Sequence, residues 1–352
     1  AERMASRNGS VISAQRRRLE EVLGRHVGPG TPYALLDFPD HSNVGDSAIY
    51  AGEVRILGEL TGAPPRYVST FRGFDPARLA RACPDGPILF HGGGNFGDLW
   101  PAHQEFREQI LARYPDRKIV QLPQSIHFQD EANVARCARA IAAHKDFHLL
   151  VRDRRGEAFA RDRFDCPVEL SPDSAFALGP LPRRGAPDLD VLLLLRTDLE
   201  ARGDRPSGAL PPRWAEADWL GDDSPGRGAR AAVHVEAVLQ GRFGREAREE
   251  WKFARLAMRR VERGLKLLSR GRGLITDRLH AHILAILLDA PHVVLDNMYG
   301  KITSYLSCWT SEYPAVRVCS TLSEAREAMP ALLRDNDAAP AAQLAATPQF
   351  QG

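Results

Sequence analysis

Short apolar runs alternate with amphipathic stretches along most of the chain. We expect buried strands at residues 33–38, 87–91, 118–122, 148–152, 168–170, 191–195, 273–276 and 292–295. Helical periodicity predicts helices at residues 11–27, 48–60, 103–114, 245–269 and 277–288. Short apolar strands separated by helices are typical of parallel α/β layers. The pattern therefore predicts an α/β protein with parallel sheets.

A stretch rich in Pro, Gly and Arg at residues 179–188 interrupts this alternation, and such a composition neither continues a helix nor joins a central strand. We predict an N-terminal Rossmann-like domain, a C-terminal Rossmann-like domain and a flexible tail, at residues 1–182, 183–334 and 335–352. Residues 199–230, dense in Gly, Pro and Asp, are expected to be irregular. Two α/β domains place a ligand in the cleft between them, at the carboxyl ends of the strands.

The charges of the chain nearly cancel. Lys and Arg number 47 and Asp and Glu 45, so the formal net charge is +2 and any anion site must be local. This balance argues against nucleic acid as a partner. Five widely spaced cysteines, without a CxxC pair or a Cys/His metal spacing, predict reduced thiols and no metal site. With no apolar run of ~18 residues and no apolar signal-peptide core, we expect a cytoplasmic protein, at most peripheral on the inner face of a membrane.

A polar turn follows the first predicted strand, with the sequence His41-Ser-Asn-Val-Gly-Asp-Ser-Ala. Asn43 and Gly45 can shape a tight turn. Asp46 either caps the next helix or accepts a proton from a substrate hydroxyl. The turn is thus a candidate for capping or for catalysis.

A second turn carries three consecutive glycines, in Phe90-His-Gly-Gly-Gly-Asn-Phe-Gly-Asp. These glycines either let backbone N–H groups surround an anion or only permit tight packing. The turn is neither a Walker loop nor a GxGxxG motif. An oxyanion loop of a hydrolase would require a GxSxG elbow, which the sequence lacks, so a hydrolase is disfavoured.

A third turn, Leu122-Pro-Gln-Ser-Ile-His, follows the strand predicted at residues 118–122. Gln124 and Ser125 either orient sugar hydroxyls or satisfy the backbone of the loop. Trp100 and His103 can offer a flat face to a sugar ring, although Trp100 can equally be buried.

The fourth turn begins a helix with the sequence Thr276-Asp-Arg-Leu-His. Thr276 or Asp277 is placed to cap the helix. Arg278 and His280 then lie in its first turn, where free N–H groups and the helix dipole favour an anion. A guanidinium suits a carboxylate or phosphate, and an imidazole can donate or move a proton. Surface salt bridges are the alternative role of this pair.

These motifs resemble the polysaccharide pyruvyl transferase family, whose bacterial members attach pyruvate as a ketal to sugars of exopolysaccharides and other glycans. The resemblance extends over about residues 41–309 and includes Asn43-Val-Gly-Asp46, residues 91–100, residues 122–125, residues 276–280, residues 296–301 and residues 305–309. The family is similar to GT-B glycosyltransferases, in which two Rossmann-like domains face a cleft.

The resemblance implies that the chain transfers the enolpyruvyl unit of phosphoenolpyruvate, a co-substrate, without any cofactor. The family's Arg-Leu-His signature corresponds to Arg278, Leu279 and His280, which would bind this donor. Arg152 is the match for a further donor-binding arginine, and Arg196 is the alternative. Lys301 adds a cation within a family motif. Two arginines, a lysine and a helix N-terminus can neutralise the donor without a metal.

For the reaction, we expect His280 to protonate the methylene carbon, while Asp46 or His91 removes the proton of the attacking sugar hydroxyl. A second hydroxyl then closes a cyclic ketal and phosphate leaves. The residues that we expect to bind the acceptor are Asn43, Gly93, Gly94, Asn95, Trp100, Gln124 and Ser125. The acceptor would be a sugar of a polysaccharide, a lipid-linked oligosaccharide or a glycolipid. The alternatives are a GT-B glycosyltransferase that uses a nucleotide sugar, and a non-catalytic glycan-binding scaffold.

Overall fold

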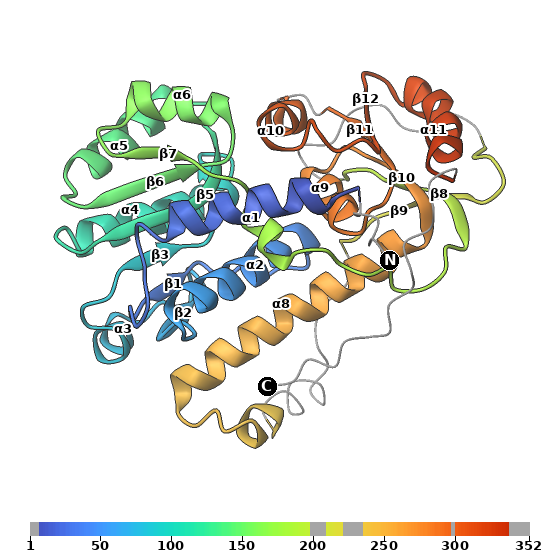
Figure 1. Ribbon diagram of the computed structural model, residues 1–352. Helices are drawn as coiled ribbons and strands as arrows, with labels where there is room; N and C mark the ends of the chain where they lie inside the picture. Colours follow the sequence, from blue (N-terminus) through green and yellow to red (C-terminus); the bar gives the residue numbers. More distant parts are fainter. Residues whose placement is uncertain (1–6, 198–208, 221–234, 297–299, 338–352) are drawn as a thin grey trace. The chain divides into compact units, whose positions relative to one another are not determined.

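The computed structural model describes residues 7–197, 209–220, 235–296 and 300–337 (Figure 1). These residues form two compact units. Residues 14–178 together with the described part of 220–261 make the seven-stranded unit. The described parts of 1–13, 179–219 and 262–352 make the five-stranded unit. Each unit is named after the number of strands in its sheet within the described residues.

The sheet of the seven-stranded unit is parallel, with the strand order β2-β1-β3-β5-β6-β7 and β4 beside β5. The strands are β1 (Ala34–Leu36), β2 (Tyr67–Ser69), β3 (Ile88–Phe90), β4 (Gly93–Gly97), β5 (Ile119–His127), β6 (Phe147–Val151) and β7 (Val168–Leu170). The helices are α2 (Val44–Thr61), α3 (Pro76–Ala82), α4 (Pro101–Arg113), α5 (Glu131–Ala142), α6 (Arg154–Arg163), the 3-10 helix η1 (Ser174–Leu178) and most of α1 (Gly9–Leu23). The central strands are buried on both faces, as apolar runs of this kind require.

Short polar side chains fix where the helices of this unit begin. Four side chains cap a helix by accepting a backbone N–H bond from its first turn: Asn43 (α2), Asp75 (α3), Asp130 (α5) and Asp153 (α6). Capping satisfies N–H groups that have no partner inside the helix. Helices α2 and α6 consequently begin close after strands β1 and β6, which places the turns at the carboxyl ends of these strands.

The sheet of the five-stranded unit is also parallel, with the order β12-β11-β10-β8-β9. Its strands are β8 (Leu189–Leu194), β9 (Trp214–Ala217), β10 (Gly271–Thr276), β11 (His292–Leu295) and β12 (Val316–Cys319). Its helices are α9 (Leu279–Leu287), α10 (Lys301–Trp309), α11 (Leu322–Asp337) and the last part of α8 (Arg245–Ser269). Two parallel α/β sheets confirm the predicted fold class.

Three stretches that we expected to be turns or irregular form strands, and β2 and β12 are strands that we did not predict. The glycine turn is itself partly a strand, because β4 pairs with β5 through residues 93–97. Strand β5 continues to residue 127, through the stretch where we expected the third turn. Strand β9 lies within residues 199–230, which we expected to be irregular. In all three cases, pairing with a neighbouring strand outweighs a local composition that disfavours strands.

The division into units also differs from the predicted boundary at residues 182 and 183. The chain does leave the seven-stranded unit near that point, after residue 178, but it returns for residues 220–261. Most of α8 therefore belongs to the seven-stranded unit, where Phe253 stacks on Phe38 with 4.2 Å between ring centroids. Arg78 in α3 also binds Glu246 and Glu249 of α8. Helix α8 thus packs on residues that lie more than 160 positions earlier in the sequence.

Two further observations concern the predicted cellular setting. All five cysteines lie in described residues and are free thiols, in agreement with the prediction. Among the described residues, no helix is both long and apolar enough to cross a membrane.

We predict that Gly52→Ala destabilises the protein, because a Cβ at this buried position of α2 would overlap the backbone oxygen of Ser174 in η1. Overpacking of this kind costs about 1–3 kcal/mol. Gly58→Ala in the same helix is the matched control, since a Cβ there meets nothing within 4 Å. It should be neutral or stabilise by about 0.5–1 kcal/mol. Urea unfolding of the two variants measures the difference, and equal stabilities would contradict the prediction.

Candidate functional site

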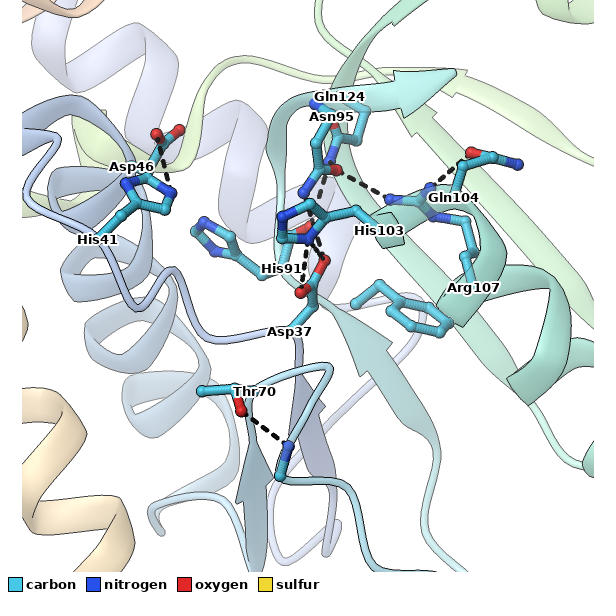
Figure 2. Close-up of polar contacts among 12 residues, drawn as sticks. Asp37, His41, Asp46, Thr70, His91, Asn95, His103, Gln104, Arg107 and Gln124 are labelled. Carbon is cyan, nitrogen blue, oxygen red and sulfur yellow. Dashed lines mark hydrogen bonds and ion pairs between the residues drawn. The ribbon is translucent and has the colours of Figure 1, made fainter. Parts of the chain in front are cut away.

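Asp37 lies directly after β1 and is the centre of a polar cluster in the seven-stranded unit (Figure 2). Its carboxylate oxygens lie 2.8 and 2.9 Å from Nδ1 of His103, at the start of α4. It also accepts a 3.3 Å bond from Nδ2 of Asn95 in β4. Asp37 is only 1% exposed and has a φ of 69°, in the left-handed region that few non-glycine residues adopt. Strained, buried residues of this kind often belong to functional sites.

A buried arginine supports this cluster from behind. The guanidinium of Arg107 donates to the amide oxygens of Gln121, Gln104 and Asn95 at 2.6, 2.7 and 2.9 Å. Burial lowers the pKa of Arg107 to about 10. Asn95 Oδ1 also accepts a 2.8 Å bond from Gln124. Because two donors occupy this oxygen, the amide group of Asn95 must turn its Nδ2 toward the carboxylate of the cluster.

His91 in the glycine turn forms a second pair with a carboxylate. Its Nδ1 lies 2.7 Å from Oε2 of Glu53 in α2, and the other oxygen of Glu53 accepts a 2.8 Å bond from the N–H of Gly92. Burial raises the pKa of Glu53. Burial alone would lower the pKa of His91, but the adjacent carboxylate outweighs it and raises this pKa. Nε2 of His91 is buried and has no hydrogen-bond partner among the described residues.

Asp46 lies in the first turn of α2, beside the glycine turn. Asn43 caps this helix through the N–H of Gly45 and donates a 2.9 Å bond to Asp46, so the cap is Asn43. The side chain of Asp46 is 23% exposed, and its Oδ1 would lie 3.4 Å from a Cβ at Gly93. Gly93 has a φ of 124°, a backbone conformation that any other residue could adopt only with strain. The structure thus brings the first and second predicted turns together.

Arg152, at the end of β6, lies in the seven-stranded unit. It donates to Ser125 Oγ at 2.8 Å and to Asp173 at 2.6 Å, and its side chain is only 4% exposed. Its Nη2 would lie 3.6 Å from a Cβ at Gly94. The charge of Arg152 is therefore balanced by a carboxylate of the protein, which sequence reasoning did not foresee. Its role toward the donor stays a prediction.

Arg278 lies at the start of α9 in the five-stranded unit. Its N–H is bound by Oγ1 of Thr276 at 3.1 Å, so Thr276 rather than the side chain of Asp277 supports this turn. Its guanidinium donates a 2.9 Å bond to Asp218 after β9 and lies 5.7 Å from the ring centroid of Trp219. No sequence motif marks Asp218 or Trp219, because they lie in a stretch that matches no known pattern.

The remaining predicted donor residues of this unit are Arg196, Leu279, His280 and Lys301. Asp277 instead accepts the backbone N–H of Arg196 at 2.8 Å, which joins the ends of β10 and β8. Leu279 is buried and His280 is partly buried, both in the first turn of α9. Lys301 begins α10, but its side chain lies outside the described residues. In the other unit, Trp100 is 44% exposed, so it is not a core residue.

Comparison with known proteins decides the family. The family model described as "Polysaccharide pyruvyl transferase" matches residues 43–298. The chain belongs to this family. The matched range begins at Asn43 in the first polar turn and includes the other three turns. It therefore contains the residues that contact Asp37, and also the start of α9.

Relatives that carry the pyruvyl transferase name include a fungal and a bacterial protein. "Pyruvyl transferase 1" of Schizosaccharomyces pombe is 34% identical over 350 residues, which cover 94% of this chain and 82% of the relative. "Putative pyruvyl transferase EpsO" of Bacillus subtilis is 33% identical over 297 residues, covering 84% and 90%. The functionally uncharacterised protein KP1_0663 of Klebsiella pneumoniae, a crystal structure, matches with a TM-score of 0.56 at 17% identity, covering 87% of this chain and 99% of that one. This last likeness supports the fold alone.

Family membership supports a transferase that acts with a pyruvyl group and a polysaccharide. Within the seven-stranded unit, the structure brings together the polysaccharide pyruvyl transferase motifs around residues 43–46, 91–97 and 124–125. The supporting residues missed from the sequence are Asp37, Glu53, Arg107, Asp173, Asp218 and Trp219. Asp37 alone offered a signal, since it is the one charged residue within the apolar strand predicted at residues 33–38.

A buried chain of hydrogen bonds anchors the helix that carries the Arg-Leu-His motif. Nδ1 of His292 donates to the backbone oxygen of Ala290 at 2.8 Å, which leaves its Nε2 to accept from Nδ1 of His282 at 2.7 Å. Nε2 of His282 in turn accepts from the hydroxyl of Thr310 at 2.8 Å. Burial lowers the pKa of His282 and lowers that of His292 to about 4. Both imidazoles are therefore neutral in the folded protein at neutral pH.

We predict that acid weakens the fold through this histidine pair. The unfolded chain takes up protons near pH 6.5 whereas the folded pair resists them, so the free energy of unfolding falls from about pH 6.5 toward pH 4. Each histidine contributes a slope of up to about 1.4 kcal/mol per pH unit. Chemical unfolding at several pH values should show a shallower decline for the double variant His282→Leu/His292→Leu. An unchanged slope would count against the prediction.

Proposed function

We propose that the chain transfers the enolpyruvyl unit of phosphoenolpyruvate to a pair of hydroxyl groups on one sugar, forming a cyclic pyruvate ketal and releasing phosphate. The sugar belongs to a polysaccharide, a lipid-linked oligosaccharide or a glycolipid. The observation that carries the proposal is the start of α9, where Arg278 and His280 adjoin a helix N-terminus inside the range that matches the family. The pyruvyl transferase names of the two relatives support it.

The donor brings a carboxylate and a phosphate, and both suit the start of α9. N–H groups of the first helical turn point at a bound anion, and the positive end of the helix dipole favours it. Asp218 and the ring of Trp219 fix the plane of the guanidinium of Arg278. A planar fork held in this way can bind a carboxylate or phosphate through two parallel hydrogen bonds. Leu279 and Lys301 belong to the same donor site in this proposal, and Arg152 or Arg196 is its second arginine.

The proposed reaction moves three protons. His280 protonates the methylene carbon of the enolpyruvyl unit, which becomes a methyl group, while a sugar hydroxyl attacks the neighbouring carbon. A base removes the proton of this hydroxyl, with Asp46 and His91 as the candidates from sequence. The bond to phosphate then breaks, the second hydroxyl forms the second C–O bond of the ketal, and its proton leaves with the phosphate. The acceptor sugar lies against the glycine turn, with Asn43, Gly93, Gly94, Asn95, Gln124 and Ser125 near it and Trp100 stacking on its ring.

We predict that phosphoenolpyruvate, and not a UDP-sugar, raises the melting temperature of the purified protein. The stabilisation follows from binding to the folded state only. Mass spectrometry of glycolipid and oligosaccharide acceptors incubated with phosphoenolpyruvate should then show the added pyruvyl mass. Stabilisation by UDP-sugars alone would favour a glycosyltransferase, and acceptor binding without consumption of any donor would favour a glycan-binding scaffold.

We predict that Arg278→Ala and His280→Ala each abolish acceptor-dependent phosphate release from phosphoenolpyruvate. Loss of a proton-transfer group typically costs ~10²–10⁴ in rate. Arg270→Ala is the matched control, because Arg270 precedes β10, pairs with Asp188 and is half exposed. It should retain the wild-type rate in the same colorimetric phosphate assay. Full activity in either variant at the start of α9 would refute the assignment.

A further inference from the structure

Two histidines of the seven-stranded unit have a carboxylate on Nδ1, and they differ in exposure. His91 pairs with Glu53 and is 2% exposed, with its Nε2 buried. His103 pairs with Asp37, and its side chain is 18% exposed. An acceptor hydroxyl can reach His103 at the surface of the protein, whereas the imidazole of His91 is enclosed. The pair with Glu53 instead holds the glycine turn through the N–H of Gly92.

The contact with Asp37 defines the chemistry of His103. Both carboxylate oxygens lie within 2.9 Å of the same ring nitrogen, so Nδ1 carries the proton and Nε2 is the basic atom. A carboxylate behind an imidazole fixes its tautomer and stabilises the imidazolium that forms when Nε2 accepts a proton. Asn95 donates to the same carboxylate and helps to hold it in place.

The position of Asp37 is maintained at an energetic cost. Its backbone adopts a φ of 69° at the carboxyl end of β1, a conformation that costs a non-glycine residue free energy. Arg107 holds Asn95, and Asn95 holds Asp37, so a chain of buried polar groups fixes the carboxylate (Figure 2). Such support from outside the reacting groups is what a precise proton acceptor requires.

We propose that His103 is the base that takes the proton of the attacking acceptor hydroxyl, and that Asp37 is its positioning residue. The inference rests on the proposed function. As the hydroxyl oxygen forms its bond to the enolpyruvyl carbon, its proton moves to Nε2 of His103, and the electron pair of the broken O–H bond remains on the oxygen. The imidazolium is neutralised by Asp37 and later releases the proton to solvent.

Other charged groups also face this imidazole. Asp37 lies on the β1 side, and His41 on the turn before α2 interacts with it electrostatically. Arg72 packs over the ring of Phe71, whose centroid lies 4.7 Å from that of His103. Asp37 is the group in hydrogen-bond contact, so its replacement gives the sharpest test.

The test compares His103→Ala with Asp37→Asn by steady-state phosphate release from phosphoenolpyruvate and an acceptor. His103→Ala should lower kcat by ~10²–10⁴ with little change in the KM for phosphoenolpyruvate, and added imidazole should restore part of the rate. Asparagine tolerates left-handed backbone, so Asp37→Asn keeps the turn. It should lower kcat and move the acidic limb of the kcat–pH profile to lower pH, because the imidazole loses its stabilising charge.

His148→Ala is the matched control, since His148 is 24% exposed and also pairs with a carboxylate, Asp146, but lies near the amino end of β6. It should leave kcat and the pH profile unchanged. If His103→Ala does not fold, His103→Gln keeps a donor for Asp37 and takes its place. A wild-type kcat in the His103 variant overturns this inference alone. So does a second result, in which His103→Ala has a lowered kcat that imidazole does not restore and Asp37→Asn has an unshifted pH profile. A wild-type protein without turnover overturns the proposed function and this inference with it.

Discussion

The polar cluster of the seven-stranded unit depends on one buried cation. Arg107 is 1% exposed and meets amide oxygens rather than a carboxylate in its described hydrogen bonds. A charge removed from water must be compensated by well-placed acceptors, and three side chains from β4, β5 and α4 are therefore fixed around it. The faces of Phe90 and Phe96 complete this enclosure, at 5.6 and 4.6 Å from the guanidinium carbon. The bond from Arg107 sets the orientation of the Asn95 amide, and this amide in turn holds the carboxylate of Asp37.

Each unit of the protein presents a different kind of polar site. The five-stranded unit offers a guanidinium whose plane is fixed by an aromatic ring and a carboxylate. The seven-stranded unit offers imidazoles backed by Asp37 and Glu53. The first arrangement suits an anionic donor, and the second suits the hydroxyl groups of a neutral sugar. The arginines of both units, Arg152 and Arg278, are each paired with a carboxylate of the protein.

The sequence identified eight of the twelve strands of the described residues, and the polar turns, because these depend on local patterns: apolar runs, helix caps and glycines. It missed interactions between residues that only the fold brings together. Asp218 lies 60 residues before Arg278, in a stretch of Gly, Pro and Asp that resembles a loop, and β9 forms there because β8 offers a strand to pair with. The left-handed conformation of Asp37 is likewise imposed by its partners. The position of Arg152 at the end of a predicted strand can be read from the sequence. Its partner Asp173, which neutralises it, cannot be predicted in this way.

The arrangement of the units along the chain has a consequence for inheritance. The chain passes between the units at residues 13–14, 178–179, 219–220 and 261–262, and α8 is shared by both. A single genetic crossover therefore cannot replace one whole unit by that of a homologue without also replacing part of the other unit. The two units are therefore inherited together unless several crossovers occur.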